Sequence, residues 1–302
     1  MSPASPGTIP AIVLGGSGYV AGELLRLLAG HPHFTLAGIL SDSRPGEAIA
    51  ASFGHLAAAY PDTRFSSQQD IEAIVARERG IAIFGAAPHG ATAALIDGLL
   101  AKSESAFGAG AARVVDISAD FRYRSAAAYE SVYQHPHGAP GRLATFTCAL
   151  PEHLAHSPTP HVAHPGCFAT ATLLASVPLL KLGLIEPELF VAAITGSTGS
   201  GRKAVDGTHH PLRHSDLYTY NALGHRHTPE IVACALAASG VEARYAFVPH
   251  SGPFARGIYA TMFTRLKAGA SAADARDALE AYYANAPFVR VTAEPPRLKD
   301  IV

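Results

Sequence analysis

The sequence has few cysteines, no excess of charge of either sign and no long uninterrupted hydrophobic run. Its three cysteines are widely spaced and odd in number, which argues against a disulfide framework and predicts free thiols in a reducing compartment. The 23 basic and 24 acidic residues leave a formal net charge of −1, so no global field attracts nucleic acid or an anionic membrane. We therefore expect a cytoplasmic protein with no nucleic-acid and no membrane partner.

The longest apolar stretch, residues 169–185, is interrupted by Pro178 and Lys181, which argues against a transmembrane helix. The first ten residues lack the basic and apolar regions of a signal peptide, so export is not expected. Hydrophobic residues nevertheless make up 48% of the 302 residues. A chain of this length and composition can bury a substantial core and suggests two domains.

The first 40 residues have the pattern of a βαβ unit. A short apolar run is followed by the turn GGSGYVAG, an amphipathic helix and a second apolar run. Glycines in such a turn let the backbone approach a dinucleotide pyrophosphate at the helix N-terminus. An ordinary tight turn is the alternative, but the position between strand and helix favours nucleotide binding. The candidate cofactor residues in this turn are Gly15, Ser17, Gly18, Tyr19 and Gly22.

The segment ILSDSRPG, at the end of the second predicted strand, bears on which dinucleotide binds. Ser41, Ser43 and Arg44 could hold the 2′-phosphate of NADP, whereas Asp42 could bind the bare ribose of NAD. The residues favour NADP(H) as the cofactor. Pro88, in the loop after the next apolar run, is a further cofactor candidate.

The rest of the chain divides into two halves with different patterns. A helix over 91–102 and the strand-like ARVVDISADFR continue the first half, and residues 123–160, rich in Tyr, His, Pro and Gly, mark the passage to the second. We predict an α/β fold, with a Rossmann-type doubly wound nucleotide-binding domain over 1–150 and an α+β substrate-binding and catalytic domain over 151–302. The elements expected in this second domain are a helix near 168–182, strands at 189–196, 244–250 and 257–266, and a helix over 271–286 capped by Ser271.

The segment HPGCFATATLL contains a candidate nucleophile. Cys167 follows Pro-Gly at the expected start of a helix, where free amides and the helix dipole stabilise a thiolate. A small residue that fills a core is the alternative reading, and it describes Cys234 within IVACALAASG better. For Cys148, both interpretations stay open.

The segment GHRHTPEI supplies candidate acid–base groups. His225 and His227 are two residues apart and face the same side of an extended segment, and Glu230 could orient one imidazole. Solvated loop histidines and a zinc site are the alternatives. Neither HExxH nor CxxC spacing occurs, so we expect no metal. Either histidine can be the acid–base residue.

A series of motifs resembles those of the N-acetyl-γ-glutamyl-phosphate reductases, a family related to the semialdehyde dehydrogenases of the aspartate-semialdehyde type. The motifs, in chain order, are GGSGYVAGELLRLL, DISADFR, ALPE, HPGCFATATLL, ITGSTGSGRKA, GHRHTPEI and FVPHSGPFARGIYAT. The resemblance implies NADPH, a thioester on Cys167, and acid–base or substrate roles for His225, His227 and Glu230. It also implies a small-molecule acyl-phosphate substrate, N-acetyl-glutamyl 5-phosphate, in arginine biosynthesis. We further expect a homo-oligomer, a dimer or a tetramer.

Two other functions stay open at this point. The segment THHPLRHSDLYTY is reminiscent of a relative in lysine biosynthesis that reduces a carrier-bound aminoadipyl phosphate. A dinucleotide-binding protein without turnover is the alternative from another class. The resemblance also leads us to expect that a C-terminal segment, which in relatives returns to the nucleotide domain, is absent after Val302.

Several basic residues are candidates for binding the substrate. Arg202 and Arg256, beside GSTGSG and PFARG, could hold the departing phosphate or the substrate carboxylate. Arg122 of DISADFR and His210 of THHPLRH complete the set.

Two motifs depart from the family pattern, with HPGCF in place of NPGCY and CALPE in place of YGLPE. Neither change removes the cysteine.

Overall fold

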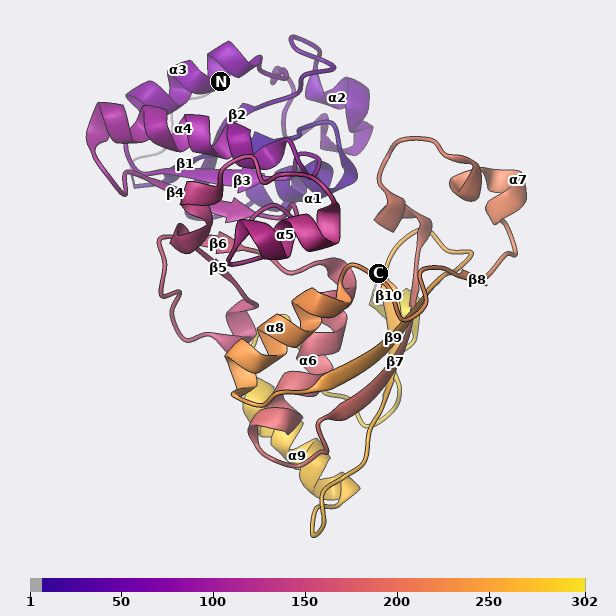
Figure 1. The fold of residues 1–302 in the computed structure, drawn as a ribbon. Helices are drawn as coiled ribbons and strands as arrows, with labels where there is room; N and C mark the ends of the chain where they lie inside the picture. Colours follow the sequence, from indigo (N-terminus) through magenta and orange to yellow (C-terminus); the bar gives the residue numbers. More distant parts are fainter. Residues whose placement is uncertain (1–6, 302) are drawn as a thin grey trace. The chain divides into compact units, whose positions relative to one another are not determined.

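A computed structural model describes residues 7–301 and divides the chain into two compact units (Figure 1). The first unit comprises Met1–Cys148 and Ser157–His164, and the second comprises Ala149–His156 and Pro165–Val302. The sequence places a single boundary after residue 150. In the structure the chain returns to the first unit over residues 157–164, because these residues add a strand to its sheet.

The first unit is built on a six-stranded parallel sheet with the strand order β2-β1-β3-β4-β6-β5. A parallel sheet whose strands are connected mostly by helices is the predicted Rossmann-type architecture, and this prediction is confirmed. The strands are β1 (Ile9–Leu14), β2 (Phe34–Ile39), β3 (Ile81–Gly85), β4 (Ala112–Asp116), β5 (Phe146–Cys148) and β6 (His161–Ala163).

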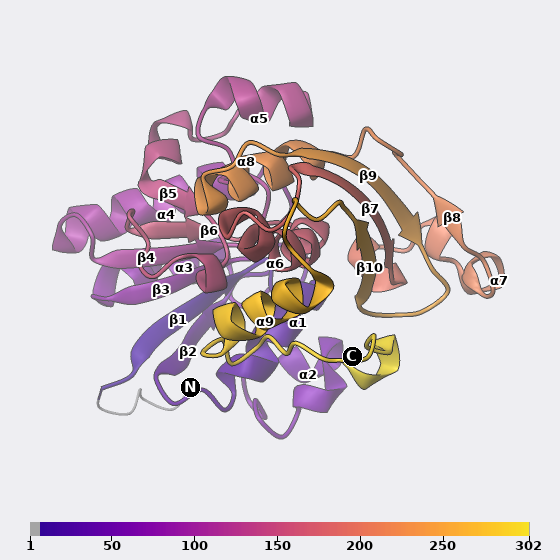
Figure 2. The same cartoon turned by 90° about the horizontal axis from the view of Figure 1, so that it is seen from below.

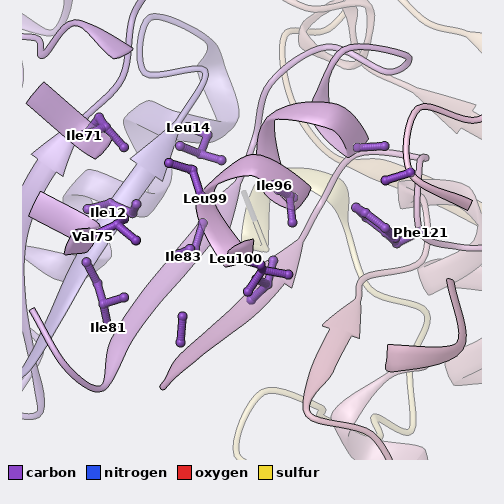
Figure 3. Packing of buried hydrophobic residues seen from close by; sticks show 14 of the residues in the cluster. Ile12, Leu14, Ile71, Val75, Ile81, Ile83, Ile96, Leu99, Leu100 and Phe121 are labelled. Carbon is purple, nitrogen blue, oxygen red and sulfur yellow. The ribbon is translucent and has the colours of Figure 1, made fainter. Parts of the chain in front are cut away.

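Helices cover both faces of this sheet. They are α1 (Tyr19–Leu28), α2 (Ile49–Ser52), α3 (Gln68–Arg77), α4 (Thr92–Phe107) and α5 (Ala126–Tyr133), with 3₁₀ turns at Gly54–Leu56 and Pro140–Thr145. Side chains alternate along β1, so Ile12 and Leu14 join a cluster with α3 and α4 (Figure 3), while Ala11 and Val13 join another with α1. Burial on both faces explains why the strand is a continuous apolar run.

Helix α4 is longer than the predicted helix over 91–102. It continues to Phe107 and ends because Gly108 adopts a φ of +86°, with its N–H donating to the Glu104 carbonyl at 2.9 Å. The last turns read AKSESAF, in which polar residues hide the apolar periodicity. Ser103 is buried all the same, so the face of the helix that packs inward continues past the recognisable pattern.

The second unit is built on a four-stranded mixed sheet with the order β10-β7-β9-β8. β7 is parallel to β9 and antiparallel to β10, and β8 is antiparallel to β9. The three predicted strands are present with ends that differ from the predicted ones by at most three residues, and the α+β class is confirmed. The strands are β7 (Glu188–Thr195), β8 (Tyr218–Thr219), β9 (Arg244–Ser251) and β10 (Ile258–Phe263).

Helices α6 and α8 pack against each other and against one face of this sheet (Figure 2). The opposite face exposes aromatic side chains, with Phe190 52%, Tyr259 39% and Phe263 63% exposed. Among residues 7–301 no helix is both long enough and apolar enough to cross a membrane. The helices of the unit are α6 (Cys167–Lys181), α7 (His210–Arg213), α8 (Thr228–Ser239) and α9 (Ala272–Tyr283), with 3₁₀ turns at Pro151–His153, Ser197–Ser200, Asp206–Thr208 and Leu298–Asp300.

Pro178 lies inside α6 and frees one carbonyl of the helix for a partner from another element. Proline has no amide hydrogen, so the Leu174 carbonyl, four residues earlier, loses its helical donor. The Tyr283 hydroxyl at the end of α9 donates to this carbonyl at 2.6 Å, and it lies 3.2 Å from Nε2 of the buried His153. The proline that interrupts the apolar run thus creates the attachment point of α9.

Candidate active site

The glycine-rich turn connects β1 to α1 and leaves the N-terminus of the helix open. Gly15 has a φ of +74°, and a Cβ there would lie 2.5 Å from the Ala86 carbonyl oxygen, so only glycine fits. Gly18 is the N-cap and offers no side chain to the first amides of α1, which favours an anion there. Gly22 packs against the Phe53 ring, 2.6 Å from where its Cβ would be. The turn fits a dinucleotide pyrophosphate.

The residues after β2 lie beside this turn. The Gly16 N–H donates to the Leu40 carbonyl at 2.7 Å, which joins the turn to the end of β2. Ser41 is buried, and its Oγ lies 3.5 Å from Ser43 Oγ. Arg44 follows directly on the surface. The structure therefore brings the glycine turn and the residues predicted to bind the ribose into one region.

Pro88 lies in the loop between β3 and α4, where its carbonyl accepts a hydrogen bond from Thr92 Oγ1 at 2.9 Å. All cofactor candidates thus follow the carboxyl ends of β1, β2 or β3. Parallel α/β sheets bind ligands at this edge. The first unit consequently fits a nicotinamide dinucleotide.

Arg122 is buried in the first unit, where it holds the segment that leads toward Cys167. Its Nε donates to the His164 carbonyl at 3.0 Å, and its Nη2 donates to the Ile117 carbonyl at 2.9 Å. The His164 N–H donates in turn to the Asp116 carbonyl at 2.7 Å. These bonds fix the backbone just after β6. Arg122 therefore positions the backbone, and its contact with a substrate stays a prediction.

Cys167 is exposed and is the first residue of α6. The N-cap, Gly166, has an extended backbone, and its N–H donates to Oε1 of Glu230. Glu230 lies in the first turn of α8 and is only 1% exposed. This hydrogen bond ties the start of α6 to α8, so the cysteine is presented at a fixed helix N-terminus. The amides and the dipole at that terminus favour a thiolate.

Phe168 packs the first turn of α6 against both candidate histidines. Its ring centroid lies 5.5 Å from that of His225 and 6.1 Å from that of His227, and the two imidazoles are 4.7 Å apart. Phe168 itself is buried. The phenylalanine that departs from the family motif thus forms an apolar wall beside the histidines. The structure brings Cys167, His225, His227 and Glu230 into one region of the second unit.

His225 is neutral at neutral pH. Burial, and to a smaller extent the charge of Arg226, lowers the pKa of His225 to about 4. Its Nδ1 accepts a hydrogen bond from the backbone N–H of His227 at 3.1 Å. The neutral ring therefore carries its proton on Nε2 and can donate there. His227 is half-buried and precedes α8 as its N-cap.

Tyr220 is a site residue that the sequence analysis missed. Its ring lies 5.6 Å from that of His225, and its N–H donates to the Pro249 carbonyl at 3.2 Å, which continues the pairing of β8 with β9. Burial, and next the negative charge of Cys167, raises the pKa of Tyr220 to about 12. Tyr220 is thus a neutral hydroxyl within electrostatic reach of the thiolate. Its position five residues before His225 was the available signal.

The segment between Tyr220 and His225 turns, with the Gly224 N–H donating to the Asn221 carbonyl at 3.0 Å. The Thr228 N–H donates to the His225 carbonyl at 2.9 Å, so the expectation of an extended segment around His225 and His227 is wrong.

The loops that carry Arg202 and Arg256 are joined by hydrogen bonds. Residues 196–198 donate backbone N–H groups to carbonyls of residues 254–257 at 2.9 to 3.0 Å. A Cβ on Gly196 would lie 2.6 Å from the Ala255 carbonyl oxygen, so this approach requires glycine. Both arginines are exposed, as expected for residues that meet a ligand from solvent.

His210 is the first residue of α7. It is exposed, and its ring is 5.6 Å from that of His214. No contact places it with Cys167, so its substrate role stays a prediction. Within the described part of the chain, no group of three or more His, Cys, Asp or Glu side chains could hold a metal ion.

The lowered pKa of His225 predicts a pH dependence of stability. Its folded pKa of about 4 lies below the value of about 6.5 for a free imidazole, so the unfolded chain binds more protons between these pH values. We expect the free energy of unfolding to fall as the pH is lowered through this window. His225→Asn should reduce that fall, since asparagine does not titrate and its Oδ1 can replace the Nδ1 acceptor.

Urea unfolding at a series of pH values measures this effect. His156→Asn is the matched control, because His156 is exposed in the same unit and its replacement should leave the pH dependence unchanged. A pH dependence of His225→Asn identical to that of the unmodified chain would contradict the prediction.

Family models match both halves of the chain. One described as "Semialdehyde dehydrogenase, NAD binding domain" matches residues 10–167, and one described as "Semialdehyde dehydrogenase, dimerisation domain" matches residues 167–302. The N-acetyl-gamma-glutamyl-phosphate reductase of Rhodospirillum rubrum is 37% identical over 286 residues, which cover 93% of this chain and 78% of the relative. That of Brevibacillus brevis is 33% identical over 294 residues, covering 96% and 82%.

Solved structures of similar fold include aspartate semialdehyde dehydrogenases. The enzyme II of Vibrio cholerae has a TM-score of 0.64 at 13% identity, covering 91% of this chain and 79% of that one. The enzyme of Candida albicans, solved with NADP, has a TM-score of 0.53 at 14% identity, covering 90% and 75%. These likenesses concern the fold of the chain.

Proposed function

Since the chain belongs to the N-acetyl-γ-glutamyl-phosphate reductase family of semialdehyde dehydrogenases, we propose that it reduces N-acetyl-glutamyl 5-phosphate to N-acetyl-glutamate 5-semialdehyde and phosphate, a step of arginine biosynthesis. The observation that carries this proposal is the exposed Cys167 at the N-terminus of α6, where the next residue, Phe168, packs against two histidines. This arrangement suits a thiolate nucleophile with an acid–base partner.

In the proposed reaction, the Cys167 thiolate attacks the acyl carbon of the substrate. The bond to the phosphate oxygen breaks, phosphate leaves with the electron pair, and a thioester forms on Sγ. The thioester carbonyl accepts hydride, and the resulting oxyanion of the thiohemiacetal takes a proton. Removal of that proton then expels the aldehyde and restores the thiolate. The cysteine replaces one difficult step by two easier ones.

We assign the proton transfers to His227. The Nδ1 of its neighbour His225 accepts the backbone N–H of His227 at 3.1 Å, and the lowered pKa keeps the His225 ring neutral. Protonation of His225 would put an N–H on Nδ1, and this donor would repel the N–H of His227. The His227 ring lies 4.7 Å from that of His225 and 6.1 Å from that of Phe168 in the first turn of α6, which makes its imidazole the acid–base candidate beside the nucleophile. His225 keeps Nε2 as a hydrogen-bond donor, and Glu230 fixes the Gly166 amide beside the nucleophile.

The cofactor is a nicotinamide dinucleotide, which supplies the hydride when bound. Gly15, Gly18 and the start of α1 would hold its pyrophosphate, with the remaining residues of the turn and Pro88 around it. We propose NADPH as the preferred form. Ser41, Ser43 and Arg44 support this preference, as does the NADP in the Candida albicans neighbour.

Exposed cations are assigned to the anionic groups of the substrate. Arg202 and Arg256, on loops that are hydrogen-bonded to each other, suit a phosphate that must leave after each turnover. His210 is retained as a further substrate candidate. Arg122, which already donates to two backbone carbonyls, supports the site mainly through the segment before Cys167.

The proposal includes a homo-oligomer in the cytoplasm. Phe190 and Phe263 are paired across β7 and β10 on the uncovered face of the second sheet, where both are more than half exposed. Apolar patches of this kind mark interaction sites, and the matching family model is described as a dimerisation domain. The free thiols of Cys148, Cys167 and Cys234 support a reducing compartment.

The reverse reaction tests the proposed function. We expect N-acetyl-glutamate 5-semialdehyde to reduce NADP⁺ only when phosphate is present, because phosphate must displace the acyl group from Cys167. The absorbance of NADPH measures the rate, and arsenate in place of phosphate serves as a positive control for acyl transfer. Turnover that requires an aldehyde attached to an acidic carrier protein would contradict the small-molecule substrate and favour the lysine-pathway relative.

A further inference from the structure

The turn after β2 carries an ion pair that the sequence analysis did not consider. Residues Arg44 to Glu47 form a four-residue turn, in which the Glu47 N–H donates to the Arg44 carbonyl at 3.2 Å and Gly46 has a φ of +80°. Pro45 in the second position and a glycine with positive φ in the third are typical of a type II turn. The turn brings its end residues together, with Arg44 Nη1 3.2 Å from Glu47 Oε2.

A second cation reaches the same turn from a segment farther along the chain. Arg64 Nη1 donates to the Gly46 carbonyl at 2.8 Å. The backbones are paired as well, since the Gly46 N–H donates to the Phe65 carbonyl at 2.8 Å and the Phe65 N–H donates to the Glu47 carbonyl at 2.9 Å. Arg64 is exposed, so its guanidinium is held at the turn yet accessible to a ligand.

We propose that Arg64 and Glu47 set how strongly the chain prefers NADPH over NADH. Arg64 is a second cation for the 2′-phosphate, and Glu47 is an internal competitor that occupies Arg44 until the phosphate displaces it. This inference rests on the proposed function, which places the adenosine ribose beside Ser41, Ser43 and Arg44.

Charge counting explains why these two residues matter. Arg44 and Glu47 balance each other within the turn, and Arg64 adds one positive charge beside it. Removal of Glu47 raises the positive charge that faces the 2′-phosphate by one and releases Arg44 from its ion pair. The Arg44 and Glu47 side chains are 41% and 49% exposed. An exposed ion pair changes a dissociation constant by a factor of about two to five.

Cofactor titrations test the proposal without turnover. Dissociation constants of NADPH and NADH are measured by nucleotide fluorescence in the unmodified chain, Glu47→Gln and Arg64→Gln. We expect Glu47→Gln to lower the dissociation constant of NADPH about two- to fivefold and Arg64→Gln to raise it about fivefold. The dissociation constant of NADH should change little in either variant. Arg64→Gln should also flatten the salt dependence of NADPH binding, since one phosphate contact is lost.

Matched controls come from surface ion pairs elsewhere in the same unit. Glu72→Gln removes the partner of Lys102 at 2.7 Å, and Arg77→Gln removes the partner of Glu78 at 3.5 Å. Both should leave the two dissociation constants unchanged. Compared with Arg44→Ala alone, the double variant Arg44→Ala/Glu47→Gln should show a smaller gain in NADPH binding than Glu47→Gln gives in the unmodified chain, because the part that acts through Arg44 is lost.

The outcomes separate this inference from the proposed cofactor preference. Equal binding of NADPH and NADH to the unmodified chain contradicts the preference itself. A clear preference that neither Glu47→Gln nor Arg64→Gln alters overturns the roles given to these residues and leaves the preference standing. Parallel changes for both nucleotides also overturn the inference, because they would show contacts with a group that NADH shares.

Discussion

Cys167→Ser is expected to abolish turnover while leaving NADPH binding unchanged. An alkoxide is far harder to form than a thiolate, and the ester of a serine accepts hydride less readily than a thioester, so we expect a loss of about 10³-fold or more. The cofactor candidates all lie in the first unit, so the nucleotide affinity should persist. Steady-state rates and a fluorescence titration of NADPH measure the two effects on the same preparation.

Trapping the acyl group identifies the nucleophile directly. Incubation with the acyl phosphate in the absence of NADPH should release phosphate and leave the acyl group on Cys167, as detected by mass spectrometry of peptides. Iodoacetamide should modify the exposed Cys167 rapidly at mildly acidic pH and the buried Cys234 slowly.

Cys148→Ser is the matched control, since Cys148 is a free, half-buried thiol in the first unit. It should retain turnover and still form the adduct on Cys167. An acyl group on Cys148, or near-normal turnover of Cys167→Ser, would return Cys167 to the role of a small structural residue.

His227→Gln is expected to lower turnover by about 10² to 10⁴, the range typical of removing a general acid–base. The same change should alter the pH dependence of kcat, because glutamine cannot transfer a proton as an imidazole does. His225→Asn should cost less, since its Oδ1 can still accept the His227 N–H. Rates measured across a series of pH values distinguish the two histidines.

The difference in turnover between these two variants tests the assignment. A larger loss in His225→Asn than in His227→Gln would reverse the assignment and make His227 the supporting residue. Comparable losses with unchanged pH profiles would remove both from the proton transfers. Circular dichroism of each variant checks that the fold around Phe168 and Phe247, which pack against His225, is retained.

Local sequence patterns predicted much of the fold, and the errors of that prediction have identifiable physical causes. The helix near 271–286 was predicted from Ser271, and the structure shows this residue as an N-cap whose side chain accepts from the Asp274 N–H. Helix α4 was predicted too short, because its last turns are polar. The domain boundary after residue 150 missed the return of residues 157–164, because a three-residue strand such as β6 has too few residues to show an apolar pattern.

The candidate site was predicted unevenly for a similar reason. The glycine turn and Cys167 were found because both depend on the residues next to them in sequence. Tyr220 was missed, since its relation to Cys167 arises only when the segment after β8 runs beside β9. Arg64 escaped notice because the turn it reaches lies 18 residues earlier.

The sequence by itself determined the βαβ unit with its open helix N-terminus, the placement of a cysteine at the start of a helix, and the histidine pair two residues apart. Each of these depends on residue order over a few positions, where propensity and spacing act directly. Only the tertiary structure decided with which partner each polar side chain forms its hydrogen bond. Glu230 accepts the Gly166 amide, Arg122 holds the His164 carbonyl, and Tyr283 takes the carbonyl freed by Pro178. In each of these bonds one partner is a backbone group of a kind that nearly every residue carries, so packing chooses among them.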